Sequence, residues 1–306
     1  MTNSIVAVVV TYNRKKLLCE NLDHLIHQSF NKFDILVIDN NSTDGTYDAI
    51  ADRINNNSNI RYINTGANLG GAGGFQYGIK KAYTLGYQYF WLMDDDSLPQ
   101  ENALSEILAA KKYLDEKNQQ WGFLSSKVVW VDGSICKMNV QRATLTKNIT
   151  DFRKPLIPAA IGSFVSLFIP ATVVKELGLP IKEFFIWTDD WEYTRRISRH
   201  YSGYVVTTSV VMHKTKSNNG ANIATDVEER IDRYKYAYRN ECYLYNREGF
   251  VGVFHILART PLHIFRVLRY SKSKRIKRIS IILGSTIRGI FFHPKIEYVS
   301  EGKETC

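Results

Sequence analysis

Short apolar runs alternate with amphipathic stretches along the first hundred residues. Runs rich in β-branched and aromatic residues predict strands, and apolar residues recurring every three or four positions predict helices. The expected strands are 5–10, 35–38, 60–63 and 89–93, and the expected helices between and after them are 15–27, 46–54 and 74–85. This alternation is typical of βαβ units, and it predicts an α/β fold whose mostly parallel sheet is flanked by helices.

The rest of the chain reads differently. Residues 98–240 mix the two patterns, with an expected helix at 101–116 and a strand near 164–169, and basic amphipathic helices follow from about residue 241. We therefore expect a catalytic domain over 1–245, with a nucleotide-binding part at about 1–97 and an acceptor part at about 98–245. Residues 246–306 would form a separate basic helical region that associates with membranes.

Polar clusters follow all four expected strands. In parallel sheets ligands bind beyond the carboxyl ends of the strands. Any one of these residues could be a turn former or a helix cap, but four successive clusters favour a nucleotide-binding crevice. The clusters are Thr11, Asn13 and Arg14, then Asp39 to Asn41, then Asn68 with a glycine run, and finally Asp94 to Asp96.

Three adjacent carboxylates end the fourth expected strand. Like charges packed together are unfavourable unless a cation offsets them. Because side chains alternate along a strand, Asp94 and Asp96 would point to one side and Asp95 away. This arrangement predicts a two-carboxylate site for Mg²⁺ or Mn²⁺, and a solvated acidic loop is the alternative.

A second acidic cluster, Trp187-Thr188-Asp189-Asp190-Trp191-Glu192-Tyr193, opens an expected helix. The carboxylates could be helix caps. The flanking Trp187 and Trp191 could instead stack on a sugar beside a carboxylate that acts as general base. Further on, His213 ends an apolar run and is a candidate third metal ligand or a structural histidine.

The run Asn68-Leu69-Gly70-Gly71-Ala72-Gly73-Gly74-Phe75 is expected to precede a helix. Without side chains, its amides could approach a diphosphate at the helix start, although a tight packing turn would also use glycine. The spacing is not G-x-G-x-x-G, and no Lys-Ser/Thr pair follows. Neither a dinucleotide-binding motif nor a P-loop is therefore indicated.

In their order along the chain, these motifs resemble glycosyltransferase family 2. They are Val-Val-Thr-Tyr-Asn-Arg, Val-Ile-Asp-Asn-Asn-Ser-Thr-Asp-Gly, Asn-Leu-Gly-Gly-Ala-Gly-Gly-Phe, Met-Asp-Asp-Asp and Trp-Thr-Asp-Asp-Trp-Glu-Tyr. The resemblance covers about residues 4–245 and is strongest to bacterial galactofuranosyltransferases, with rhamnosyltransferases next. It implies a GT-A fold and inversion at the anomeric carbon.

The resemblance also implies roles for single residues. Asp190 would be the general base, with Asp189 and Glu192 positioning the acceptor or sugar and Trp187 and Trp191 contacting the acceptor. Asp94, Asp96 and His213 would bind Mn²⁺ or Mg²⁺. The residues expected around the nucleotide-sugar are Thr11, Arg14, Asp39, Asn68, Gly71, Asp94 and Asp95. Tyr238-Arg239-Asn240 also resembles a segment common in these enzymes, without a known role.

The net charge of +10 is confined to one region. No Asp or Glu lies between Glu248 and Glu297, where ten Lys and Arg residues account for the whole excess. Apolar stripes such as Ile276, Leu283 and Ile287 run beside these bases, which predicts helices lying in the interface of an anionic membrane. The uninterrupted apolar runs look too short to span a bilayer. Packing on the catalytic domain is the alternative, and the absence of a DNA- or RNA-binding motif argues against nucleic acid.

The four cysteines lack metal-binding or disulfide spacing, and the apolar run 5–10 is too short for a signal peptide. We therefore expect a cytoplasmic protein on the inner face of the cell membrane. The expected activity is inverting transfer of galactofuranose from UDP-galactofuranose to a lipid-linked glycan in cell-surface polysaccharide synthesis, such as that of an O-antigen.

Three alternatives stay open. The first is a rhamnosyltransferase that uses dTDP-rhamnose. The second is a nucleotidyltransferase, although the basic, glycine-rich loop expected near its first strand is missing. The third is a non-catalytic nucleotide-sugar-binding protein. The sequence does not reveal the oligomeric state.

Overall fold

The alternating apolar runs of the first hundred residues form the parallel half of a sheet. A computed structural model describes residues 3–299, so Cys306 lies outside the described part. Strands β1 (Ile5–Thr11), β2 (Asp34–Asp39), β3 (Ile60–Asn64) and β4 (Tyr89–Asp94) pair in the order β3-β2-β1-β4. Thr11 lies opposite Asp39 and Val10 opposite Asp94, so the carboxyl ends of three strands meet at one edge.

The sheet continues beyond β4 with mostly antiparallel pairs. Its order is β4-β8-β6-β9-β5, with β7 also paired to β9. The bounds are β5 Ser97–Pro99, β6 Trp121–Val129, β7 Leu156–Pro158, β8 Leu167–Pro170 and β9 Ser202–His213. Ser97 pairs with His213, and this register brings the end of β9 to the acidic residues after β4.

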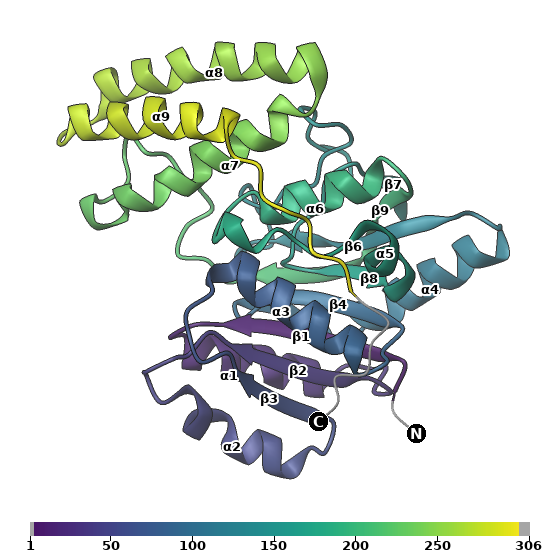
Figure 1. The fold of residues 1–306 in the computed structure, drawn as a ribbon. Helices are drawn as coiled ribbons and strands as arrows, with labels where there is room; N and C mark the ends of the chain where they lie inside the picture. Colours follow the sequence, from purple (N-terminus) through teal and green to yellow (C-terminus); the bar gives the residue numbers. More distant parts are fainter. Residues whose placement is uncertain (1–2, 300–306) are drawn as a thin grey trace.

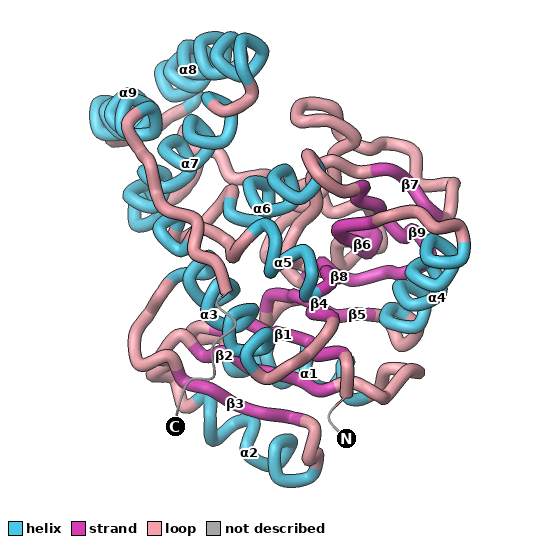
Figure 2. Tube along the Cα trace, turned by 45° about the vertical axis from the view of Figure 1, so that its right-hand side comes forward, coloured by secondary structure: helices cyan, strands magenta, loops and turns pink. Residues whose placement is uncertain are grey.

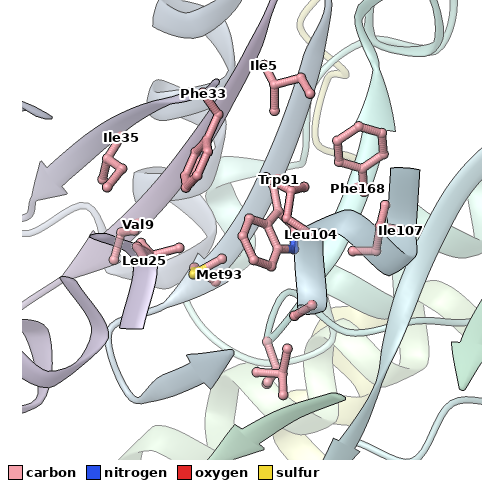
Figure 3. Packing of buried hydrophobic residues seen from close by; sticks show 14 of the residues in the cluster. Ile5, Val9, Leu25, Phe33, Ile35, Trp91, Met93, Leu104, Ile107 and Phe168 are labelled. Atoms are coloured by element: carbon pink, nitrogen blue, oxygen red, sulfur yellow. The ribbon is translucent and has the colours of Figure 1, made fainter. Parts of the chain in front are cut away.

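Helices cover both faces of the sheet (Figure 1). One core cluster packs Trp91 of β4 with Leu104 and Ile107, as Figure 3 shows, and a second packs Val8 and Ile38 with Phe75. The helices are α1 Lys15–Ile26, α2 Thr46–Asn56, α3 Gly70–Thr84, α4 Ala103–Glu116, α5 Ala171–Leu177 and α6 Asp189–Ser198, with short 3₁₀ turns at Lys182–Phe184 and Glu228–Arg233.

The glycine run differs from its prediction, because it forms the first turns of α3 instead of preceding the helix. A Cβ at Gly74 would lie 2.6 Å from Val10 Cγ1, and one at Gly78 would lie 2.6 Å from Val8 Cγ1. These glycines therefore let α3 approach β1 and β2 more closely than any side chain would allow. A Cβ at Gly71 would meet no atom within 4 Å, so this position stays open.

Three helices stand at one end of the molecule, beside the end of the sheet that holds β7 and β9 (Figure 1 and Figure 2). They are α7 Tyr234–Asn246, α8 Gly249–Tyr270 and α9 Arg275–Ile290. Residues 291–299 then run back over the catalytic domain (Figure 1), where Glu297 pairs with Lys80 and its carbonyl accepts from Leu179 N. The predicted α/β sheet and basic C-terminal helices are confirmed, while the domain limits at 97 and 245 stay predictions.

Candidate active site

The acidic residues after β4 converge with the end of β9. The ligand atoms of Asp94, Asp96 and His213 all lie within 4.8 Å of one another, and His213 Nε2 lies 3.0 Å from Asp96 Oδ1. Two carboxylates and an imidazole are a donor set that suits Mn²⁺ and also accepts Mg²⁺. The residues therefore fit the predicted metal group.

Asp95 is not part of this group, and it lies with Asp96 in the turn that follows β4. It accepts from Thr11 Oγ1 at 2.7 Å and from Arg14 Nη1 at 3.2 Å. The same Arg14 nitrogen lies 2.7 Å from Asp96 Oδ2. Thr11 and Arg14 thus hold the acidic turn from the end of β1, and their predicted contacts with the nucleotide stay predictions.

The pKa values in the acidic group diverge. Burial, followed by the charge of Asp96, raises the pKa of Asp94 to about 7. Burial also raises the pKa of Asp95 to about 7. Burial on its own would raise the pKa of Asp96 and lower the pKa of His213. The pairing of these two side chains outweighs burial, so the pKa of Asp96 is lowered and the pKa of His213 is raised to about 10.

Asp39 lies at the end of β2 and is buried. Its Oδ1 accepts from the backbone nitrogen and hydroxyl of Ser42 at 2.8 and 2.6 Å, and its Oδ2 accepts from the Tyr62 hydroxyl at 2.5 Å. Nearby, Asn68 Oδ1 accepts from Gly70 N at 2.9 Å. Both predicted nucleotide-binding side chains are held by the protein, and their contacts with a nucleotide stay predictions.

The second acidic cluster opens α6 after a strained turn. Phe185, Trp187 and Thr188 have φ of 63°, 68° and 69°, a region that non-glycine residues rarely adopt. The Asn240 side chain of α7 donates to the carbonyls of Phe184, Ile186 and Trp187 at 2.9 to 3.1 Å. Asn240 therefore holds the turn that aims Asp189 and Asp190.

Both aspartates are perturbed by their surroundings. Burial and the charge of Asp190 raise the pKa of Asp189 well above its usual range, and Asp94 adds to this effect, so these carboxyls lie within electrostatic reach of one another. Burial raises the pKa of Asp190 to about 6, partly offset by hydrogen bonds from Trp191 N and Ser163. With this pKa, Asp190 is mostly ionised at neutral pH, and its role as the general base stays a prediction.

Glu192 and the two tryptophans do not gather around a common point. Both carboxylate oxygens of Glu192 accept from the Arg196 guanidinium, at 3.0 and 2.9 Å. Trp187 packs against Tyr234, whereas the Arg142 guanidinium covers Trp191 at 3.8 Å from the ring centroid. The structure therefore places the tryptophans in separate clusters, and their contacts with an acceptor stay predictions.

Comparisons with known proteins agree with this geometry. The family described as glycosyl transferase family 2 matches residues 6–134. Galactofuranosyltransferase GlfT1 of Mycolicibacterium smegmatis is 25% identical over 269 residues, which cover 81% of this chain and 85% of that protein. GlfT1 of Mycobacterium tuberculosis is 30% identical over 214 residues, covering 65% of this chain and 66% of that protein, just under two thirds of its length. The chain therefore resembles the glycosyltransferases of family 2.

Solved structures of other glycosyltransferases have the same fold as this chain. The S. aureus TarS structure covers 94% of this chain and 71% of its own, with a TM-score of 0.54 and 15% identity. Mannosyltransferase PcManGT from Pyrobaculum calidifontis, solved with GDP-Man and Mn²⁺, covers 94% and 74%, with a TM-score of 0.53 and 14% identity. The expected GT-A fold is confirmed.

Sequence reasoning missed four side chains that support the site. Asn240 belongs to the Tyr238-Arg239-Asn240 segment, for which no role was predicted. Asn139, Arg142 and Ser163 come from the long connection between β6 and β8 and reach His213, Trp191 and Asp190 respectively. No local pattern marks these three residues, because their partners lie 74, 49 and 27 positions away in the sequence.

Proposed function

We propose that this protein is a family 2 glycosyltransferase that moves galactofuranose from UDP-galactofuranose to a lipid-linked glycan, with inversion and with a divalent cation. The observation that carries the proposal is the Asp94, Asp96 and His213 group, from which hydrogen bonds through Asn139 lead to Ser163 beside Asp190. The similarity to two galactofuranosyltransferases supports the donor sugar. dTDP-rhamnose is the alternative donor that the sequence motifs leave open.

The two acidic groups divide the work. Asp94, Asp96 and His213 would hold Mn²⁺ or Mg²⁺, which when bound stabilises the charge that gathers on the leaving diphosphate. Asp190 accepts the proton of the acceptor hydroxyl as that hydroxyl attacks the anomeric carbon. Asp189 is buried, and burial together with the charge of Asp190 raises its pKa, which favours the protonated form; a protonated Asp189 would donate a hydrogen bond to a sugar oxygen. Direct attack needs no covalent intermediate, which is consistent with inversion.

A donor panel tests this proposal. Purified full-length protein is given UDP-galactofuranose, dTDP-rhamnose, UDP-glucose or GDP-mannose, with Mn²⁺ and a membrane extract as acceptor, and release of nucleoside diphosphate is measured with and without extract. We expect acceptor-dependent release with UDP-galactofuranose. Release only from dTDP-rhamnose would select the alternative donor, and tight donor binding without release would favour a non-catalytic protein.

We also propose that helices α8 and α9 bind an anionic membrane. The polar face of α8 lies against α7, where His255 stacks on Tyr245 with ring centroids 3.9 Å apart, Arg259 pairs with Glu241, and His263 contacts the edge of Tyr238. An amphipathic helix of a soluble domain turns its apolar face inward. The outward apolar face of α8 therefore indicates an apolar environment around it.

The exposed apolar surface is large. Phe250, Phe254, Leu257 and Phe265 of α8 are 95, 72, 66 and 60% exposed, and Ile276 of α9 is 86% exposed. Apolar surfaces of this extent mark binding sites in soluble proteins. Lys and Arg residues of the same helices, such as Arg269 and Arg288, supply charges for anionic headgroups.

Two expectations about these helices change. First, α8 continues through Pro261 for 22 residues, and by length and composition it is able to cross a membrane, so the predicted shortness of its apolar segment is wrong. Its pairing with α7 nevertheless favours a position in the membrane interface.

Second, several basic residues make contacts inside the protein: Lys277 pairs with Asp232, and the buried Arg278 donates to the carbonyls of Ile223 and Asp226. Hydrophobic contact therefore contributes more than the charge count predicts.

A further inference from the structure

Asn139 lies between the two acidic groups and contacts the supports of both. Its Oδ1 lies 2.7 Å from His213 Nδ1, and its Nδ2 lies 2.8 Å from Ser163 Oγ. Ser163 is buried, and its hydroxyl interacts with Asp190 and helps to lower the pKa of that carboxyl. Hydrogen bonds thus connect Asp96 through His213 and Asn139 to Ser163, the neighbour of Asp190.

The directions of these hydrogen bonds follow from the donors and acceptors available. Ser163 Oγ accepts from Asn139 Nδ2 and from Val165 N at 3.3 Å, so its own hydrogen is free to be donated to Asp190. The carbonyl oxygen of Asn139 must then face His213, where it accepts from Nδ1–H. Accepting there leaves His213 Nε2 directed at Asp96 and at the metal group.

We infer that Asn139 is a positioning residue that sets both halves of the proposed reaction. Through its carbonyl it selects the His213 tautomer whose Nε2 can bind a metal ion. Through its amide group it turns the Ser163 hydroxyl towards Asp190, which fixes the direction of the base. The inference rests on the proposed function for Asp190, but its metal-binding half is independent of which sugar is transferred.

The loop that carries Asn139 offers a matched control. Asn218, which follows β9, accepts from Lys137 N at 2.7 Å and donates to Ser134 Oγ and to the Ile135 carbonyl at 3.1 Å. Asn218 therefore holds the same loop two residues or more from Asn139 by contacts that do not involve His213 or Ser163. Removing it tests the order of the loop alone.

The test uses four variants of the full-length protein. Mn²⁺ affinity is measured by calorimetry without donor, and kcat is measured with saturating Mn²⁺, donor and acceptor. Asn139→Ala should weaken Mn²⁺ binding about 10- to 100-fold, as loss of an outer partner of a metal-binding histidine does, and should also lower kcat. Ser163→Ala should leave Mn²⁺ affinity unchanged and lower kcat about tenfold, because one hydrogen bond to a charged group is lost. Asn218→Ala should match the wild type in both.

The fourth variant separates the two contacts of Asn139. Asn139→Asp keeps an acceptor for His213 Nδ1–H but replaces the amide donor, so Ser163 would donate to the new carboxylate instead of to Asp190. We expect near-normal Mn²⁺ affinity with a kcat as low as that of Ser163→Ala. If Asn139→Ala cannot be purified, Asn139→Leu has a similar size and also lacks both hydrogen bonds.

The outcomes discriminate clearly. Wild-type Mn²⁺ affinity in Asn139→Ala, or an equal loss in Asn218→Ala, would overturn the inference. If the wild type transfers no sugar from any donor but Asn139→Ala still binds Mn²⁺ more weakly than Asn218→Ala, the metal-positioning half stands and the proposed function fails.

Discussion

Soluble proteins usually bury apolar side chains and expose charged ones. The candidate active-site edge of the sheet and the surface of α8 depart from this pattern in opposite directions. At the edge, carboxyl groups such as Asp95, Asp96 and Asp189 are buried, and at α8 phenylalanines such as Phe250 and Phe254 face solvent. Buried charge and exposed apolar surface are both unfavourable in an isolated protein. We therefore expect each region to bind a partner of opposite character, a cation with a diphosphate in one case and lipid in the other.

The two regions also differ in how they are held. Hydrogen bonds and ion pairs fix the acidic residues, with Arg14 contacting both Asp95 and Asp96. In contrast, α8 is held on its inner side by polar contacts with α7 and by apolar residues such as Ile264 and Val267, while its phenylalanines stay exposed. The comparison shows that the inner contacts of α8 are partly polar, whereas its outer surface is apolar.

The largest expected effect is on the metal group. Chelation with EDTA should abolish turnover, because Asp94, Asp96 and His213 then lack the cation that stabilises the leaving diphosphate. Sugar transfer is measured after EDTA treatment and after adding back excess Mn²⁺ or Mg²⁺, which should restore it. Binding to liposomes in EDTA is the control and should not change. Full transfer in EDTA would mean that the buried carboxyls have another purpose.

The second effect separates the two acidic groups. Asp190→Asn should lower kcat by about 10² to 10⁴, the usual contribution of a general base, because an amide cannot accept the proton of the acceptor. Donor affinity should change little, since Asp190 is outside the metal group. Asp96→Asn is the contrast, and it should weaken Mn²⁺-dependent donor binding as well. If Asp190→Asn keeps near-normal kcat at saturation, Asp189 becomes the next candidate for the base.

The third effect concerns α8. The double variant Phe254→Ser with Phe265→Ser should bind anionic liposomes about tenfold more weakly for each phenylalanine lost, because burying one such side chain contributes about 1.5 to 3 kcal/mol. Sedimentation with vesicles at low and high salt measures this, and the loss should persist at high salt. Arg269→Gln is the matched control on the same helix, and its smaller loss should disappear at high salt.

Comparison of the phenylalanine variant with the wild type can also contradict membrane binding by α8. Equal sedimentation of the variant and the wild type would move membrane binding away from α8. The exposed face would then need a protein partner, such as a second copy of this chain. Light scattering of the free protein would test that possibility directly.

The parts of the fold predicted well from sequence are those set by local patterns. Strands β1 to β4 match their predicted ranges to within a residue or so at each end, because βαβ units repeat apolar runs that are fully buried. The start of α3 was predicted four residues late. Glycine is a poor helix former, and only close packing of Gly74 and Gly78 on the sheet explains why the helix includes the run.

Site residues that are adjacent in the sequence could be predicted, whereas features of the site that depend on contacts between distant residues could not. Asp94 and Asp96 follow from strand alternation, and their meeting with His213 is seen in the structure. The predicted pairing of Trp187 with Trp191 rested on their positions on either side of the acidic residues. Trp187 precedes the helix in a strained turn with φ of 68°, which sends the two rings to separate clusters.

The smallest expected effect is a pH dependence that comes from the candidate active-site edge alone. Burial raises the pKa of Asp190 to about 6, and the residue acts as a base only when it is ionised. As pH falls through about 6, the ionised fraction falls, so kcat should decline about tenfold for each pH unit below that value. Above pH 7 this group is nearly fully ionised, and its contribution should be level.

The profile is measured with saturating donor, acceptor and Mn²⁺, so that weaker metal binding at low pH does not imitate the effect. Asp190→Asn serves as the control, because its residual activity should lack this limb, while liposome binding by α8 should stay flat across the same range. An unchanged acidic limb in Asp190→Asn would assign the titration to another group and remove the main argument for Asp190 as the base.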